Sequence, residues 1–123
     1  MTLPNPEKVL VVDDDAAIRV VVTRLLAKHG IEVLSARNVE EAINHLQMEP
    51  RISRLLVDLN LAEAQRGTEV AEVAQKLRPD LDCIFMSGES INDLTEIQEQ
   101  TLCSGLLKKP FRAQELIEIL AIT

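Results

Sequence analysis

The chain has 123 residues, of which 46% are hydrophobic, so it is long enough for one buried core and too short for two. Its 20 acidic residues outnumber 13 basic ones, and the formal net charge is −7. Because the lysines and arginines are scattered, no basic face is available for a nucleic-acid backbone. We therefore expect a single domain over residues 1–123, folded from about 8 to 120, with no output domain and no direct nucleic-acid contact.

The cysteines and the start of the chain predict its cellular setting. Cys83 lies inside an apolar run and Cys103 lies near a predicted turn, with neither metal-site spacing nor the density of a disulfide scaffold. Residues 1–8 contain no apolar stretch that resembles a signal peptide, and no segment reaches the ~18 consecutive apolar residues of a membrane span. These features predict a soluble protein of the reducing cytoplasm that does not bind membranes.

Five short apolar runs predict strands, and the segments between and after them predict helices. The predicted strands cover residues 9–12, 31–36, 55–58, 83–87 and 106–108. Apolar residues recur at helical spacing within residues 18–26, 39–46, 67–77, 89–100 and 116–120. The fourth helix has few apolar residues and is expected to move most easily. Strands that alternate with helices predict a parallel sheet covered on both faces, a three-layer α/β/α domain.

Several residues mark the ends of these helices. Asp15 is placed to cap the first helix, and Gly30 lies where a glycine commonly ends one. Asn38, with Glu41 three residues later, resembles a capping box at the start of the second helix. Pro79 closes the third helix.

Polar side chains stand where the predicted strands end. Asp13 and Asp14 follow the first strand, Asp58 ends the third, Ser87 ends the fourth and Lys109 follows the fifth. The carboxyl ends of parallel strands meet at one edge of a sheet, where ligands bind. Carboxylates a few ångströms apart repel by about 4 kcal/mol per pair at an effective dielectric of 20, so the cluster needs a cation or raised pKa values. Oxygen ligands of this kind suit Mg²⁺ (or Mn²⁺) and phosphoryl chemistry.

Each of these residues also has a purely structural interpretation. For Asp15 alone we prefer the role of a helix-start residue. Taken singly, Asp58 could be an ordinary strand-end acid and Ser87 a turn cap. Lys109 could be a surface lysine like Lys108, but alternation along a strand puts the two on opposite sides, and a residue before proline is held extended. Only one of them can point into the site, and we choose Lys109.

Four motifs, in this order and at these intervals, closely resemble the receiver domain of two-component response regulators. They are Val11-Val12-Asp13-Asp14-Asp15, Val57-Asp58-Leu59-Asn60, Met86-Ser87-Gly88 and Lys108-Lys109-Pro110-Phe111. The resemblance covers nearly the whole chain, and four ordered motifs are specific where any one would be weak. It implies a flavodoxin-like, doubly wound fold with five helices and a five-stranded parallel sheet in the order 2-1-3-4-5.

The resemblance also implies a role for each acidic residue of the site. Asp58 would be the phosphoacceptor and a metal ligand. Asp14 would bind Mg²⁺ directly, Asp13 would bind it through water, and Asn60 would bind it through its backbone carbonyl.

A signalling mechanism is implied as well. Lys109 would pair with Asp58 or its phosphate, Ser87 would be the switch hydroxyl, and the Lys109–Pro110 peptide would be cis. The phosphoryl group would come from a phosphohistidine on a sensor histidine kinase or a histidine phosphotransfer protein. The chain would then signal to an unidentified downstream protein through a conformational change, as a phosphoacceptor that assists its own phosphorylation and dephosphorylation rather than an enzyme.

Two features depart from the family pattern. Leu106 stands where many members carry an aromatic switch residue, so an inward-swinging ring is unavailable. The loop after Asp58 lacks the usual proline and is one residue longer than in chemotaxis-type receivers, which is closer to receivers that belong to or serve hybrid sensor kinases.

Two other functions remain open from the sequence. One is a small aspartyl-nucleophile phosphatase of the haloacid-dehalogenase type, because residues 13–15 contain an Asp-x-Asp pattern with Ser87 and Lys109 later in a similar order. However, the chain lacks the acidic metal-binding pair that such phosphatases have after the lysine, and this function would leave Asp58 without a role. The other is a degenerate receiver that binds partners without phosphorylation, against which the intact strand-end residues argue.

Overall fold

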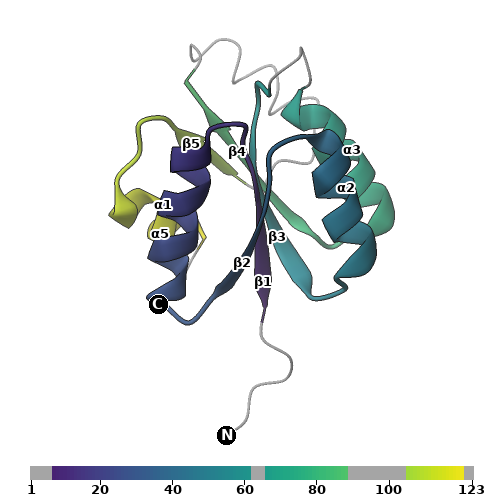
Figure 1. Ribbon diagram of the computed structural model, residues 1–123, viewed down its shortest axis with the longest axis horizontal. Helices are drawn as coiled ribbons and strands as arrows, with labels where there is room; N and C mark the ends of the chain where they lie inside the picture. Colours follow the sequence, from purple (N-terminus) through teal and green to yellow (C-terminus); the bar gives the residue numbers. More distant parts are fainter. Residues whose placement is uncertain (1–6, 62–65, 89–104, 121–123) are drawn as a thin grey trace, which may run out of the picture.

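The computed structural model describes residues 7–61, 66–88 and 105–120. Along these ranges strands and helices alternate up to the fourth strand, and the fifth strand is followed by a last helix (Figure 1). The elements are β1 (Lys8–Val12), α1 (Ala16–Ala27), β2 (Glu32–Ala36), α2 (Val39–Met48), β3 (Ile52–Asp58), α3 (Gly67–Leu77), β4 (Asp82–Ser87), β5 (Gly105–Lys108) and α5 (Ala113–Ile119). The helix predicted within residues 89–100 lies outside the described residues. None of the helices in the described ranges is long and apolar enough to cross a bilayer.

All five strands form one parallel sheet in the order β2-β1-β3-β4-β5, which confirms the predicted order. In Figure 1, α1 and α5 cover one face of the sheet, and α2 and α3 cover the other. All five residues of β1 are buried. A strand covered on both faces is expected to be apolar throughout, and this explains why the strands appear in the sequence as continuous apolar runs.

Alternate residues of the central strands supply two separate cores. Leu10 and Val12 pack in the core beneath α2 and α3, whereas Val9 and Val11 pack in the core beneath α1 and α5. This separation follows from the two-residue period of a strand, which sends successive side chains to opposite faces. Leu106 is partly buried and packs against the α2–α3 core.

Both predicted N-terminal helix caps are present, with one difference at the second. The Asp15 carboxylate accepts a hydrogen bond from Ala17 N at 2.9 Å, and the Asn38 side chain accepts one from Glu41 N at 2.9 Å. The Glu41 carboxylate does not return to Asn38, but accepts the backbone N–H of Arg37 at 3.0 Å. A salt bridge between the Arg37 and Glu41 side chains, at 2.8 Å, draws the carboxylate one residue outward.

A cluster of charged side chains around Lys8 lies at the end of the sheet opposite the strand-end acids. The Lys8 side chain is only 8% exposed, and its Nζ lies 2.8 Å from Glu49 Oε2 and 3.2 Å from Glu32 Oε2. The hydrogen bond from Lys8, with further bonds from Arg51, lowers the pKa of Glu49 to about 2. This group ties the start of β1 to β2 and to the chain after α2.

Candidate functional site

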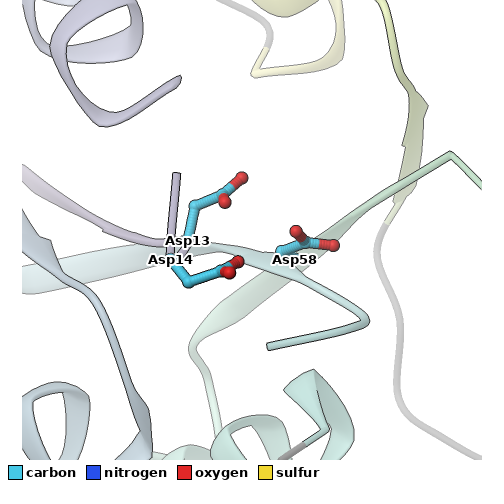
Figure 2. A group of neighbouring side chains, drawn as sticks. All are labelled: Asp13, Asp14 and Asp58. Carbon is cyan, nitrogen blue, oxygen red and sulfur yellow. The ribbon is translucent and has the colours of Figure 1, made fainter. Parts of the chain in front are cut away.

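Three carboxylates converge where β1 and β3 end. Asp13 is completely buried, Asp58 is buried, and Asp14 is exposed. Figure 2 shows Asp13 and Asp14 on the turn after β1 and Asp58 at the end of β3. One oxygen from each of the three carboxylates lies within 4.8 Å of the others. The register explains this meeting, because Val12, the residue before Asp13, pairs with Val57, the residue before Asp58.

A single lysine bridges two of these carboxylates. Lys109 Nζ lies 2.7 Å from Asp13 Oδ2 and 3.0 Å from Asp58 Oδ2. The backbone N–H of Lys109 donates to Ser87 O at 2.8 Å, which anchors the turn after β5 to the end of β4. Lys108 is exposed, so Lys109 is the lysine that reaches the site. The Lys109–Pro110 peptide is cis, as the resemblance implied.

Burial and charge act in opposite directions on Asp13 and Lys109. Burial raises the pKa of Asp13 above its ordinary value, although hydrogen bonds from Lys109 and from the backbone of Asp15 favour the charged carboxylate. Burial alone would lower the pKa of Lys109, but its hydrogen bonds to Asp13 and Asp58 outweigh it and raise that pKa. The site therefore holds a permanent cation beside carboxylates that would otherwise repel one another.

The backbone around Asp58 is held by the start of α3. Asp58 Oδ1 accepts the backbone N–H of Asn60 at 3.2 Å, and Gly67 N donates to Leu59 O at 2.9 Å. A Cβ on Gly67 would lie 2.2 Å from the carbonyl oxygen of Asp58. Glycine is thus required where α3 begins, because only a residue without a side chain lets the helix approach this close. The sequence had indicated only that a helix opens at Gly67.

Ser87 is buried at the end of β4, beside the end of β3. Its neighbour Met86 pairs with Asp58 in the sheet, and Met86 O accepts the backbone N–H of Leu59 at 3.0 Å. The backbone of Ser87 is held from the other side by Lys109, so the fold places Ser87 at the same edge as the three carboxylates. All six residues predicted for the site, including Asn60, therefore lie at strand ends or in the segments that directly follow them, at one end of the sheet.

One contact at this edge had no sequence signal. Arg19, in α1, donates from Nη1 to the backbone carbonyl oxygen of Asp13 at 2.7 Å. Helical periodicity had assigned α1 its apolar face, but a hydrogen bond from a polar side chain to a strand-end carbonyl leaves no trace in that pattern.

The arrangement has defined chemical abilities. Carboxylate oxygens that lie this close together, one of them on the exposed Asp14, form a donor set for a hard divalent cation. Asp58 offers a carboxylate nucleophile, and the Lys109 ammonium can balance negative charge that develops on an incoming group.

Comparisons with known proteins agree with this geometry. The family model of the response regulator receiver domain matches residues 9–121. The response regulator receiver protein CpdR of Brucella abortus (strain 2308) is 31% identical over 111 residues, which are 90% of this chain and 91% of CpdR. The DNA-binding transcriptional regulator NtrC of Azospirillum brasilense is 29% identical over 111 residues, which are 90% of this chain but 23% of NtrC. A solved CheY-like receiver domain protein from Methanospirillum hungatei JF-1 has 27% identity and a TM-score of 0.86, over 95% of this chain and 92% of that one.

Proposed function

Because the chain belongs to the response regulator receiver domain family, we propose that it accepts a phosphoryl group on Asp58 in a Mg²⁺-dependent reaction. The observation that supports this most strongly is the pair of contacts from Lys109 to Asp13 and Asp58, with Asp14 beside them. A structural ion pair needs one acid for its lysine, whereas this edge gathers three acids, two of which contact the same lysine.

The proposed donor is a phosphohistidine on a sensor histidine kinase or a histidine phosphotransfer protein. A carboxylate oxygen of Asp58 attacks phosphorus, an O–P bond forms, and the P–N bond to the imidazole breaks. The leaving imidazole nitrogen takes a proton from water. Such a transfer is catalysed mainly by positioning and by neutralising the phosphoryl oxygens, and Lys109, 3.0 Å from Asp58 Oδ2, is placed to follow the charge from carboxylate to phosphate.

The donor set fits Mg²⁺, or Mn²⁺ in its place. Asp14 and Asp58 would bind the ion directly, Asp13 would bind it through water, and the backbone carbonyl of Asn60 would complete the protein ligands. When bound, the ion supplies charge neutralisation at the phosphoryl oxygens. Asp13 suits an indirect role, because it is completely buried and its two carboxylate oxygens accept hydrogen bonds from Asp15 N and Lys109 Nζ at 2.9 and 2.7 Å. The bonds that Asp58 accepts, from Asn60 N and Lys109 Nζ, are longer, at 3.2 and 3.0 Å.

The phosphorylated chain would signal through Ser87, whose hydroxyl is proposed to turn toward the new phosphate and to change the surface read by a downstream protein. Position 106 is a leucine that is partly buried against the α2–α3 core. Because leucine has no aromatic ring, we propose that this rearrangement proceeds without a ring that changes its position there. The family assignment supports neither the phosphatase nor the degenerate receiver. We place the reaction in the cytoplasm, in a single domain.

Intact-mass measurement after treatment with acetyl phosphate tests the proposal. The wild type should gain the mass of one phosphoryl group in the presence of Mg²⁺ and none in excess EDTA, and Asp58→Asn should gain none. Asp15→Asn is the matched control, since it removes one charge from the same edge and keeps a good helix cap. Equal phosphorylation of the wild type and Asp58→Asn would contradict the proposal.

A further inference from the structure

Arg19 makes a contact that the phosphoacceptor chemistry described above does not use. Its guanidinium reaches from α1 to the backbone carbonyl oxygen of Asp13, at a donor–acceptor distance of 2.7 Å. We propose that Arg19 is a positioning residue that fixes the direction of Asp14 for cation binding. This inference rests on the proposed function, because it concerns the Mg²⁺ site of that function.

Asp13 is fixed from four directions. Its backbone N–H donates to Ala36 O at 3.0 Å, its Oδ1 accepts from Asp15 N at 2.9 Å, and its Oδ2 accepts from Lys109 at 2.7 Å. The bond from Arg19 engages the last polar group, the carbonyl oxygen. Because these partners come from β2, the turn itself, the end of β5 and α1, Asp13 is held in one orientation.

Asp14 lacks such restraints. It is exposed, and within the described part of the chain its carboxylate makes no hydrogen bond. Figure 2 nevertheless shows its side chain directed from the turn toward Asp58. Since no hydrogen bond of its own within the described residues holds the Asp14 side chain there, its direction depends on where the backbone places its Cα.

The peptide bond supplies the connection between the two residues. The carbonyl group of Asp13 lies in one rigid plane with the nitrogen and Cα of Asp14. A hydrogen bond that fixes this carbonyl therefore fixes the point from which the Asp14 side chain departs. Arg19 is suited to this task because it is half-buried and its own backbone is anchored, with Arg19 N donating to Asp15 O at 3.2 Å.

A positioning role and a simple charge effect predict opposite changes in Mg²⁺ affinity. If Arg19 acted only as a positive charge near three carboxylates, its removal would strengthen the binding of a divalent cation. If it positions Asp14, its removal should weaken binding, and substitutions outside the direct ligands typically reduce metal affinity by about 10- to 100-fold. The direction of the change in Mg²⁺ affinity thus separates the two roles. An effect on helix stability alone would leave the Mg²⁺ affinity unchanged.

Isothermal titration calorimetry with Mg²⁺ provides the test, because the chain has no tryptophan or tyrosine to report binding by fluorescence. Arg19→Gln should bind Mg²⁺ about tenfold or more weakly than the wild type. Arg24→Gln is the matched control, since Arg24 lies on the same helix, is exposed, and has no side-chain hydrogen bond within the described ranges. The control should bind Mg²⁺ as tightly as the wild type or slightly more tightly.

Equal or tighter binding by Arg19→Gln would overturn the positioning role and leave the proposed function intact. Absence of Mg²⁺ binding by the wild type would instead overturn the proposed metal site, and this inference with it. Circular dichroism of the metal-free variants checks folding. Should Arg19→Gln fail to fold, Arg19→Lys decides, because it keeps the charge and loses the fork of donors. A several-fold loss of affinity supports positioning, and wild-type affinity overturns it.

Discussion

Replacing Gly67 by alanine should push the start of α3 away from Asp58. The new Cβ would lie 2.2 Å from the carbonyl oxygen of Asp58 and 3.1 Å from Cγ2 of Val57. Ordinary contact begins at 3.4 Å, so the first separation must grow by more than 1 Å. The obstructing atom belongs to the backbone, which cannot rotate aside as a flexible side chain can. We expect the free energy of unfolding to fall by about 1–3 kcal/mol.

The same displacement should slow phosphorylation. A shift of about 1 Å in a reacting group can reduce a rate by about 100-fold, so transfer from acetyl phosphate to Asp58 should fall by one to two orders of magnitude. Urea denaturation in EDTA gives the stability, and intact mass against time gives the rate.

Two other glycines serve as controls for this variant. Among the described residues, a Cβ on Gly88 would meet no atom within 4 Å, and its φ is not positive, so Gly88→Ala should leave stability unchanged or raise it by about 0.4–1 kcal/mol. Gly30 has the same free space but a φ of 74°, so Gly30→Ala should cost about 1 kcal/mol from backbone strain alone. If Gly67→Ala is as stable as Gly88→Ala and is phosphorylated at the wild-type rate, the close approach of α3 to Asp58 is wrong.

Four further predictions concern the site, Leu106 and the charged group around Lys8. Asp14→Ala should stabilise the metal-free protein by up to about 1 kcal/mol, because it relieves repulsion between the carboxylates. It should also abolish the thermal stabilisation by Mg²⁺, which in the wild type should reach about 2.7 kcal/mol when Mg²⁺ is in hundredfold excess over its dissociation constant. An unchanged response to Mg²⁺ would show that Asp14 is not part of the site. Lys109→Met leaves a buried carboxylate without its cation and should cost about 1–3 kcal/mol. That cost should be greater above neutral pH than in mild acid, because burial already raises the pKa of the Asp13 carboxyl, which loses its cation in this variant; a pH-independent cost in urea denaturation would argue against the pairing. The pKa of Glu49 falls from 4.5 to about 2 on folding, so its stabilising effect is complete above pH 4.5 and is lost as the pH falls toward about 2. Glu49→Gln should flatten the stability profile in that window, and an identical profile would contradict the contact with Lys8. Leu106→Ala should change the hydrogen-exchange response to beryllofluoride only modestly, and loss of that response would show that Leu106 carries the signal.

Most of the fold could be predicted because strands that are covered on both faces are apolar throughout. The start of β3 could not be predicted, because the apolar run begins at Leu55 whereas the strand begins at Ile52. Arg54 lies within the added segment, and its guanidinium donates to Leu120 O at 2.5 Å. A polar side chain whose hydrogen-bond partner lies in a distant part of the chain interrupts the apolar pattern of the sequence without interrupting the strand.

The site divides in the same way. Strand-end residues could be assigned from the sequence, because topology alone brings the ends of β1, β3, β4 and β5 to one edge. The contributions of Arg19 and Gly67 depend on distances between α1, α3 and the strand ends, which no local pattern encodes. Those two positions act on the backbone of Asp13 and Asp58, so they carry no signature of their own in charge or periodicity.

Locating the phosphoryl group tests the central claim most directly. The protein is phosphorylated with acetyl phosphate and Mg²⁺, reduced with borohydride, which converts an aspartyl phosphate to homoserine, and digested for peptide sequencing by mass spectrometry. We predict homoserine at position 58 and unmodified aspartate at Asp13 and Asp14. Homoserine at position 13 with Asp58 unmodified would contradict the account and favour a nucleophile on the turn after β1.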